Sequence, residues 1–186
     1  MRKDLGVKTF IYPQPVLMIA TYDENKNPDC MNAAWGGISD SNKISIALSA
    51  FHKTTKNILL NKAFTVSPAI KKYIKECDYL GIASGNTVKD KLKVCNFHTV
   101  DSKFVNAPLI EELPLTLECQ LLNYDENTEI LTGEILNVSV DESILTKGKI
   151  DPNKLEAIAF DPANASYLLV KGKVGNAFQD GKDLLK

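Results

Sequence analysis

The sequence has 186 residues, of which 44% are hydrophobic and 24% are charged. These values are typical of a single globular domain, which we predict to span residues 1–186, and they argue against intrinsic disorder. The 22 basic and 23 acidic side chains leave a formal net charge of −1, which argues against a protein dedicated to binding nucleic acid.

The N-terminal third of the chain predicts β-structure. Residues 16–22 and 29–37 are β-prone and flank a cluster of turn-forming residues at 23–28, a pattern that indicates a hairpin. Residues 44–49 alternate between apolar and small side chains, as in a strand with one buried face. A further short strand is predicted at residues 64–67.

Two segments in the middle of the chain change to a helical period. Residues 54–62 set apolar side chains among polar ones and begin with Thr54, which is a suitable N-cap. Residues 69–80 gather apolar side chains on one helical face and predict a second helix. We expect a loop or a short helix over residues 81–92.

A long antiparallel pair of strands is predicted in the second half. Apolar residues occupy every second position from 113 to 121, and after a turn at 125–128 the chain returns over 129–141. In the return strand the apolar side chains change parity near Gly133, which predicts a bulge or a close backbone approach. Strands with inserted helices, without the regular alternation of a parallel sheet, indicate a mostly β fold built as an antiparallel barrel.

Signals for targeting and for metal binding are weak. No apolar run approaches the ~18 residues of a membrane span, and residues 1–5 lack the apolar core of a secretory signal. We therefore predict a cytoplasmic protein without a membrane partner. The four cysteines form no C-x-x-C pair and the chain has two histidines, so no zinc site is expected and the cysteines are predicted to be reduced and structural.

The segment Asn32-Ala-Ala-Trp35 contains the only tryptophan of the sequence. Small residues beside an aromatic ring let a planar ligand lie close to backbone amides, so this segment is a candidate binding surface. A core tryptophan at a strand end also needs small neighbours, and composition alone favours that structural interpretation.

Two further segments carry hydroxyl groups and lysines. His52-Lys-Thr-Thr55 opens a predicted helix, whose free amides and dipole favour an anion such as phosphate. Residues 84–91 (Ser-Gly-Asn-Thr-Val-Lys-Asp-Lys) add similar groups in a predicted polar loop without Walker A spacing. A plain helix cap and a solvated turn explain the same residues. Because Arg2 is the only arginine, an anion site must use lysines, hydroxyls and amides.

In order and spacing, these motifs resemble the flavin reductase-like FMN-binding split-barrel family, and within it the flavoredoxin branch. The resemblance extends from about residue 15 to residue 178. Beyond the three segments above, it rests on Phe64-Thr-Val-Ser67, Asp78-Tyr-Leu-Gly81, Lys89-Asp-Lys91, Ala107-Pro-Leu-Ile110, Leu117-Glu-Cys119 and Gly133-Glu-Ile135.

The family implies a six-stranded antiparallel Greek-key barrel that holds FMN near the interface of a homodimer. By this resemblance, the flavin ring lies beside residues 32–35, and the phosphate lies at the start of the helix and under the polar loop. The implied cofactor contacts are Asn32, Ala33, Ala34, Trp35, Ser49, Ala50, Phe51, His52, Thr54, Thr55, Ser84, Gly85 and Lys91. No metal and no catalytic side chain are expected, since the flavin carries the chemistry.

Two further expectations concern particular residues. Phe51 and Phe160 are apolar residues that would fit a dimer interface. Lys91 is expected in an exposed polar turn, where its removal would weaken phosphate binding without unfolding the protein.

The sequence departs from the family pattern at two places. His52 stands where many relatives carry arginine, and residues 123–128 contain no histidine, although many reductases of the family place one near the nicotinamide in this turn.

Two functions follow from the resemblance. One is an enzyme that takes hydride from NADH or NADPH and reduces flavin or another acceptor. The other is a flavoredoxin-like carrier between protein partners, without direct NAD(P)H turnover. A third possibility is a split barrel that binds something other than flavin.

Overall fold

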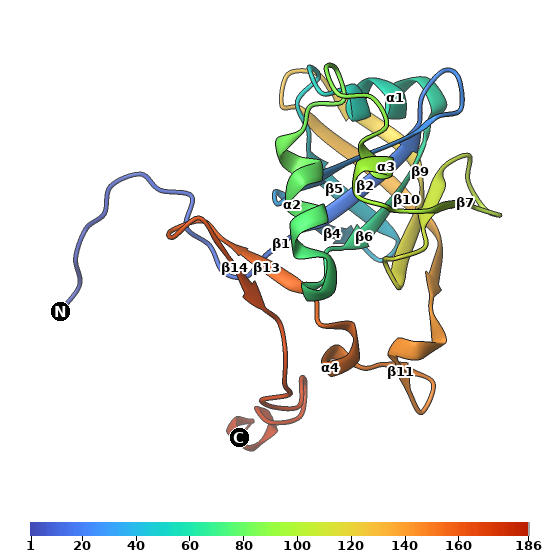
Figure 1. Ribbon diagram of the computed structural model, residues 1–186. Helices are drawn as coiled ribbons and strands as arrows, with labels where there is room; N and C mark the ends of the chain where they lie inside the picture. The colour runs from blue at the N-terminus through green and yellow to red at the C-terminus, as the bar shows by residue number, and fades with distance from the viewer. Residues whose placement is uncertain (186) are drawn as a thin grey trace.

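The computed structural model describes residues 1–185. Its main element is an antiparallel sheet of seven strands in the order β3-β2-β6-β9-β10-β5-β4 (Figure 1). In chain order these strands are β2 (Leu17–Tyr22), β3 (Pro28–Ala33), β4 (Gly36–Asp40), β5 (Lys43–Ala47), β6 (Ala63–Pro68), β9 (Leu115–Asp125) and β10 (Ile130–Val140). The predicted hairpin is the pair β2–β3, and the predicted long antiparallel pair is β9–β10.

The sheet rolls up because its two edge strands are consecutive in the chain. Strands β3 and β4 stand at opposite ends of the strand order, yet only Ala34 and Trp35 connect them. A link of two residues spans about 10 Å at most, so the two edges meet at Ala34 and Trp35, a place we call the barrel seam. The predicted antiparallel split barrel is confirmed, and its sheet has seven strands where six were expected.

The helices are inserted between strands, as predicted. Helix α1 (Lys53–Asn61) links β5 to β6, and η1 (Lys71–Tyr73), α2 (Ile74–Ile82) and α3 (Lys91–Val94) follow β6. The N-cap of α1 is His52, whose side chain makes no capping hydrogen bond. The prediction that Thr54 caps this helix is therefore wrong: Thr54 is already helical, and its hydroxyl has another partner.

Short elements complete the chain. Strand β1 (Gln14–Pro15) pairs with β13 (Ile158–Asp161), which pairs with β14 (Ser166–Leu169). The others are the hairpins β7 (Thr99–Asp101) with β8 (Pro108–Ile110) and β11 (Leu145–Thr146) with β12 (Lys149–Ile150), and the helical turns η2 (Glu142–Ile144), α4 (Pro152–Leu155) and η3 (Lys182–Leu184). Within residues 1–185, no helix is long and apolar enough to cross a membrane.

Two apolar cores lie on the two faces of the main sheet. One joins strands from across the sheet to α1 and includes Ile19, Ile58 and Phe64. The other packs the opposite face against the elements that follow β6 and includes Met18 and Leu80. Because successive side chains of a strand point to opposite faces, β2 contributes to both cores, and all six of its residues are buried.

The irregularity predicted at Gly133 is present. The pairing of β10 with β9 shifts register between Thr132 and Gly133, which is a bulge in the ladder. A Cβ added at Gly133 would lie 2.4 Å from the Phe64 ring. The close approach at this position is therefore made by an aromatic side chain of the core, which leaves no room for a larger residue.

Both ends of the chain extend away from the barrel as arms (Figure 1). Residues 1–13 and 170–185 are exposed throughout. The arms nevertheless carry large apolar side chains, including Val7, Ile11 and Phe178. Exposed apolar side chains in this number are typical of surfaces that contact another molecule.

Candidate functional site

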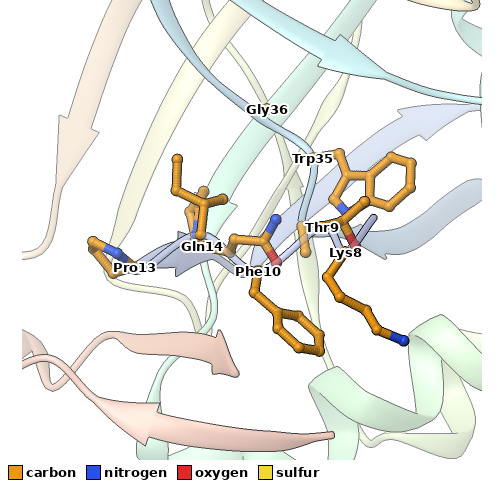
Figure 2. Close-up of a pocket in the computed structure, with 10 residues that line it drawn as sticks. Lys8, Thr9, Phe10, Pro13, Gln14, Trp35 and Gly36 are labelled. Atoms are coloured by element: carbon orange, nitrogen blue, oxygen red, sulfur yellow. The ribbon is translucent and has the colours of Figure 1, made fainter. Parts of the chain in front are cut away.

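A cavity of about 500 Å³ opens at the barrel seam. Its lining residues come from two parts of the chain, the N-terminal residues 8–11 and 13–15 and the residues 34–36 at the seam (Figure 2). This volume lies within the range of small-molecule sites. The Trp35 side chain remains 58% exposed. The interpretation that composition alone favoured, a tryptophan buried in the core, is therefore wrong, and a binding role for this segment stays a prediction.

Gln14 lines this cavity, and its amide oxygen is buried and unpaired. The residue is only 8% exposed, and its Oε1 atom accepts no hydrogen bond. Figure 2 shows the Gln14 amide among the lining side chains, between Pro13 and Trp35. Leaving a buried acceptor unpaired costs about 1–3 kcal/mol. A ligand that donates an N–H or O–H group at this point would remove that cost.

A second set of unsatisfied groups lies at the start of α1. Within residues 1–185, the backbone amides of Lys53, Thr54 and Thr55 have no acceptor. The Thr55 hydroxyl oxygen is fully buried and also lacks a partner. Free amides and the helix dipole together favour an anion here. In the described part of the chain, Thr55 Oγ1 and Gln14 Oε1 are the two buried side-chain polar atoms without a hydrogen bond.

The loop after α2 closes over the start of α1. Asn86 donates from its Nδ2 atom to the Phe51 carbonyl at 3.0 Å. A Cβ added at Gly85 would lie 3.3 Å from Lys53 Cβ, so a glycine here permits the close approach. Ser84 is exposed beside them, and its hydroxyl accepts from the Asn86 amide at 3.3 Å. The structure thus brings together the second and third predicted segments.

Two hydrogen bonds tie the first predicted segment to neighbouring elements. The Trp35 carbonyl accepts from the Ala47 amide at 2.8 Å, at the end of β5 and just before the loop that leads to α1. Asn32 donates from Nδ2 to the Cys77 carbonyl at 3.0 Å, which ties β3 to α2. The first segment is thus held next to β5 and α2, the elements that precede the second and third predicted segments, and the Asn32 amide is used within the protein.

Asp29 in β3 contacts both the second and the third predicted segments. Its buried carboxylate accepts a hydrogen bond from the Thr54 hydroxyl at 2.6 Å. Lys91 Nζ lies 3.8 Å from the other carboxylate oxygen, and the Asn57 amide makes a longer contact of 3.5 Å. Two of the residues predicted to contact phosphate, Thr54 and Lys91, are thus directed at a carboxylate of their own chain.

The environment of Lys91 differs from the predicted exposed turn. Lys91 is the first residue of α3 and is only 5% exposed. Its ammonium group donates to the carbonyls of Ala83 at 3.1 Å and Leu80 at 3.4 Å. Carbonyls at the end of a helix lack intrahelical partners, and a lysine can satisfy them. The expectation of an exposed Lys91 is therefore wrong. Its ammonium group is buried between the carbonyls at the end of α2 and the carboxylate of Asp29.

Glu129 accepts hydrogen bonds from two more of the residues that were predicted to contact the cofactor. Its Oε1 atom accepts from the Ala50 amide at 3.0 Å and from the Ser49 hydroxyl at 2.8 Å. These hydrogen bonds, that of Ala50 first, hold the pKa of Glu129 below its ordinary value. The loop before α1 is therefore fixed by a carboxylate. His52 and Phe51 remain exposed there, and Phe51 is 81% exposed.

The cysteines lie in the cores and away from nucleophilic chemistry. All four are free thiols. Burial raises the pKa of Cys77 and of Cys119 to about 12, and raises that of Cys30 well above its ordinary value. Because a thiol must lose its proton to act as a nucleophile, these side chains are structural. Within residues 1–185, no three metal-ligating side chains gather in one place.

Three residues around the site were not predicted as part of it. Asp29 falls in a β-prone segment, Glu129 follows a turn, and Gln14 stands between two prolines. Each acts through a contact or a cavity that the fold creates, so none carries a local signal. Gln14 alone has an unusual local setting, because Pro13 and Pro15 on either side of it favour an extended backbone. That setting does not by itself indicate a binding site.

A family model and solved structures match this chain over most of its length. Residues 9–154 match the family described as "Flavin reductase like domain". Over 97% of its length the chain is similar to a solved flavoredoxin of Desulfovibrio vulgaris (Miyazaki F), with 36% identity, all of that protein covered and a TM-score of 0.93.

More distant structures share the fold. A flavoredoxin from Methanosarcina acetivorans is 25% identical over 98% of this chain and 100% of its own, with a TM-score of 0.87. An FMN-binding domain of a flavin reductases-like enzyme from Shewanella baltica is 16% identical over 88% of this chain and 89% of its own, with a TM-score of 0.78.

Proposed function

The chain belongs to the flavin reductase like family, and within it to the flavoredoxin branch, and we propose that it is a flavoprotein that binds FMN and reduces a flavin or another acceptor with NADH or NADPH. The observation that carries the proposal is the pair of unpartnered buried polar atoms. One belongs to Gln14, which lines a cavity large enough for a ring ligand, and the other belongs to Thr55, at a helix start suited to an anion. FMN offers a matching group for each.

The ring end of the proposed site is the cavity at the barrel seam. A flavin ring carries one imide N–H, and Gln14 Oε1 is a buried acceptor without a donor. The small side chains of Ala33 and Ala34 leave room beside the backbone, and the exposed Trp35 indole offers the ring an apolar surface. This assignment extends the prediction from the sequence, which placed the ring beside residues 32–35.

The phosphate end of the proposed site is the start of α1. The amides of residues 53–55 and the Thr55 hydroxyl are unsatisfied, and His52 and Ser84 are exposed beside them. Hydrogen bonds to a charged group contribute about 1.5–3 kcal/mol each, so several such donors can hold a phosphate without arginine. Gly85 lets the covering loop approach closely enough to shield the anion from water.

The bound flavin would supply the redox chemistry by accepting a hydride and passing on electrons. The residues of this chain position the ring, neutralise the phosphate and exclude water. A second candidate function, an electron carrier between protein partners without direct NAD(P)H turnover, is favoured by the absence of histidine from residues 123–128 and by the similarity to flavoredoxins.

The two functions predict different kinetics. An absorbance spectrum of the purified protein should show a bound flavin, and steady-state oxidation of NADH or NADPH with free FMN should follow if the protein is a reductase. A carrier should instead keep an FMN that dithionite reduces and that neither nicotinamide cofactor reduces. A colourless protein that binds no added FMN would contradict both functions.

We also propose a homodimer. The terminal arms and the residues Trp35, Ile38 and Phe51 expose apolar side chains on one chain, and the site at the barrel seam is open to water. Phe160 fits an interface less well, because it packs on Tyr167 of its own chain with ring centroids 6.3 Å apart. Sedimentation should give twice the chain mass of 20.5 kDa, and a mass of one chain at micromolar concentration would contradict the proposal.

A further inference from the structure

Asp29 connects the elements that surround the proposed phosphate site. Its carboxylate contacts Thr54 in the first turn of α1 at 2.6 Å and lies 3.8 Å from Lys91 of α3. A Cβ added at Gly85 would lie 3.0 Å from Asp29 Oδ1, so the carboxylate also lies directly against the loop that covers the site. The residue is 7% exposed and therefore acts in a region of low effective dielectric.

The Asp29 carboxylate supplies the negative charge near the start of α1 that an acidic residue in the first turn of a helix can provide. Helix α1 has no acidic residue in its first turn and no side-chain cap. A negative charge near a helix start is favourable, and Asp29 supplies it from a neighbouring strand through Thr54. The same charge balances the buried Lys91, whose other contacts are backbone carbonyls.

A fixed negative charge at this point also opposes a phosphate. Two like charges within several ångströms repel strongly when little water lies between them. Asp29 therefore stabilises the site in the absence of ligand and weakens the attraction that Lys91 and the α1 dipole exert on an incoming phosphate. A flavin without a phosphate group would not experience this repulsion.

We propose that Asp29 is a positioning residue that sets how strongly the site prefers a phosphorylated flavin. The proposal rests on the proposed function, because it requires the phosphate of FMN to lie at the start of α1. Asp29 touches no ligand in this proposal. It acts through the Thr54 hydroxyl, the Lys91 ammonium and its own charge.

The test is the variant Asp29→Asn, measured with FMN and riboflavin as separate probes. Asparagine keeps an oxygen that can accept from Thr54 and removes the charge. We expect FMN to bind about tenfold more tightly, which corresponds to about 1.4 kcal/mol, and riboflavin to bind as in the wild type. The thermal midpoint without ligand should fall, because Lys91 loses its counter-charge, and FMN should raise it by more than in the wild type.

A matched control removes the same charge elsewhere. Asp40→Asn breaks an exposed pair with Lys43 at 2.9 Å, at the end of β5 that is farther from α1. It should leave both affinities unchanged. A general effect of net charge would instead appear in Asp40→Asn as strongly as in Asp29→Asn.

The outcomes separate this proposal from the proposed function. Weaker binding of FMN and riboflavin in Asp29→Asn by equal factors, or unchanged preference between them, would overturn the role of Asp29. Failure of the wild type to bind FMN would overturn the proposed function and this inference with it. Should Asp29→Asn not fold, the double variant Asp29→Asn, Lys91→Gln leaves no unpaired charge. It should keep the wild-type preference for FMN within about threefold, because attraction and repulsion are removed together, and a tenfold loss of preference would overturn the proposal.

Discussion

The Asn32 side chain lies directly over Gly81. A Cβ added at Gly81 would lie 2.2–2.4 Å from the atoms of the Asn32 amide group, and the same amide donates to the Cys77 carbonyl one helical turn earlier at 3.0 Å. Strand β3 and helix α2 are thus fixed to each other where the glycine leaves space. This contact determines the position of the chain just before the barrel seam.

Gly81→Ala should destabilise the protein by about 1–3 kcal/mol, because the new methyl group displaces the Asn32 amide and breaks its hydrogen bond. Flavin affinity should fall as well, since Ala33 to Trp35 follow directly. Chemical denaturation measures the first effect and flavin fluorescence the second. Gly37→Ala is the control, because a Cβ there meets nothing within 4 Å, and equal effects of the two variants would contradict the contact.

Thr55→Val should leave the ligand-free protein as stable as the wild type or more stable. Its hydroxyl is buried without a partner, so its removal eliminates an unpaired group. FMN affinity should fall several-fold while riboflavin affinity stays the same. Thr54→Val should behave oppositely and destabilise the ligand-free protein, because it removes the 2.6 Å hydrogen bond to Asp29. Thermal melts with and without each flavin decide between the two patterns.

Gln14→Leu tests the ring end of the site. The unpaired Oε1 atom disappears, so the stability without ligand should not fall. FMN and riboflavin share the imide N–H, and both should bind about fivefold to thirtyfold more weakly if Gln14 accepts from it, which is about 1–2 kcal/mol. Titration by flavin fluorescence gives both affinities. Unchanged affinities would show that the Gln14 amide does not meet the ring.

Lys91→Ala should lower the free energy of unfolding by about 3 kcal/mol or more, because it leaves Asp29 buried without a counter-charge and frees two helix-end carbonyls. Lys89→Ala, at an exposed position, should change stability by less than about 0.5 kcal/mol. Urea unfolding of both variants is the measurement. A Lys91→Ala protein as stable as Lys89→Ala would contradict the buried role of this lysine.

The pH dependence of the β13–β14 hairpin should follow Asp161. The hydroxyl of Tyr12, which donates to this carboxylate, and then the Asn164 amide lower the pKa of Asp161 to about 2. A carboxyl group with a lowered pKa in the folded state stabilises that state fully above its unfolded pKa of about 3.9, and the contribution is lost as the pH falls toward 2.

The thermal midpoints of the wild type and Asp161→Asn should therefore differ by a constant amount above pH 5, and the difference should close between pH 4 and pH 2. A difference that rises as the pH falls would contradict this assignment. The Tyr12→Phe variant removes the main hydrogen bond that lowers the pKa of Asp161. In that background, the stabilising effect of the Asp161 carboxylate should be lost at a higher pH.

Much of the fold could be predicted from local pattern. The strands at residues 16–22 and 44–49 show a period or composition that neighbouring residues alone determine, and the structure contains them as β2 and β5. The parity change near Gly133 also predicted its bulge, because alternation along a strand records which face each side chain must bury. The helix after β5 was predicted from its apolar period, with its start placed at Thr54, two residues after the observed N-cap His52.

Local pattern and motif order therefore suffice to predict the strand-rich order, the three candidate segments and the family they resemble. Which groups of those segments are free to bind a ligand depends instead on contacts between residues that are distant in the chain. Thr54 and Lys91 face Asp29, and Ser49 faces Glu129, whereas Gln14 and Thr55 have unpaired atoms. Local periodicity reports burial, but a hydrogen bond between distant residues depends on how strands are ordered in the sheet. The pairing of polar groups across the fold therefore became visible only when β3, α1 and α3 were placed side by side.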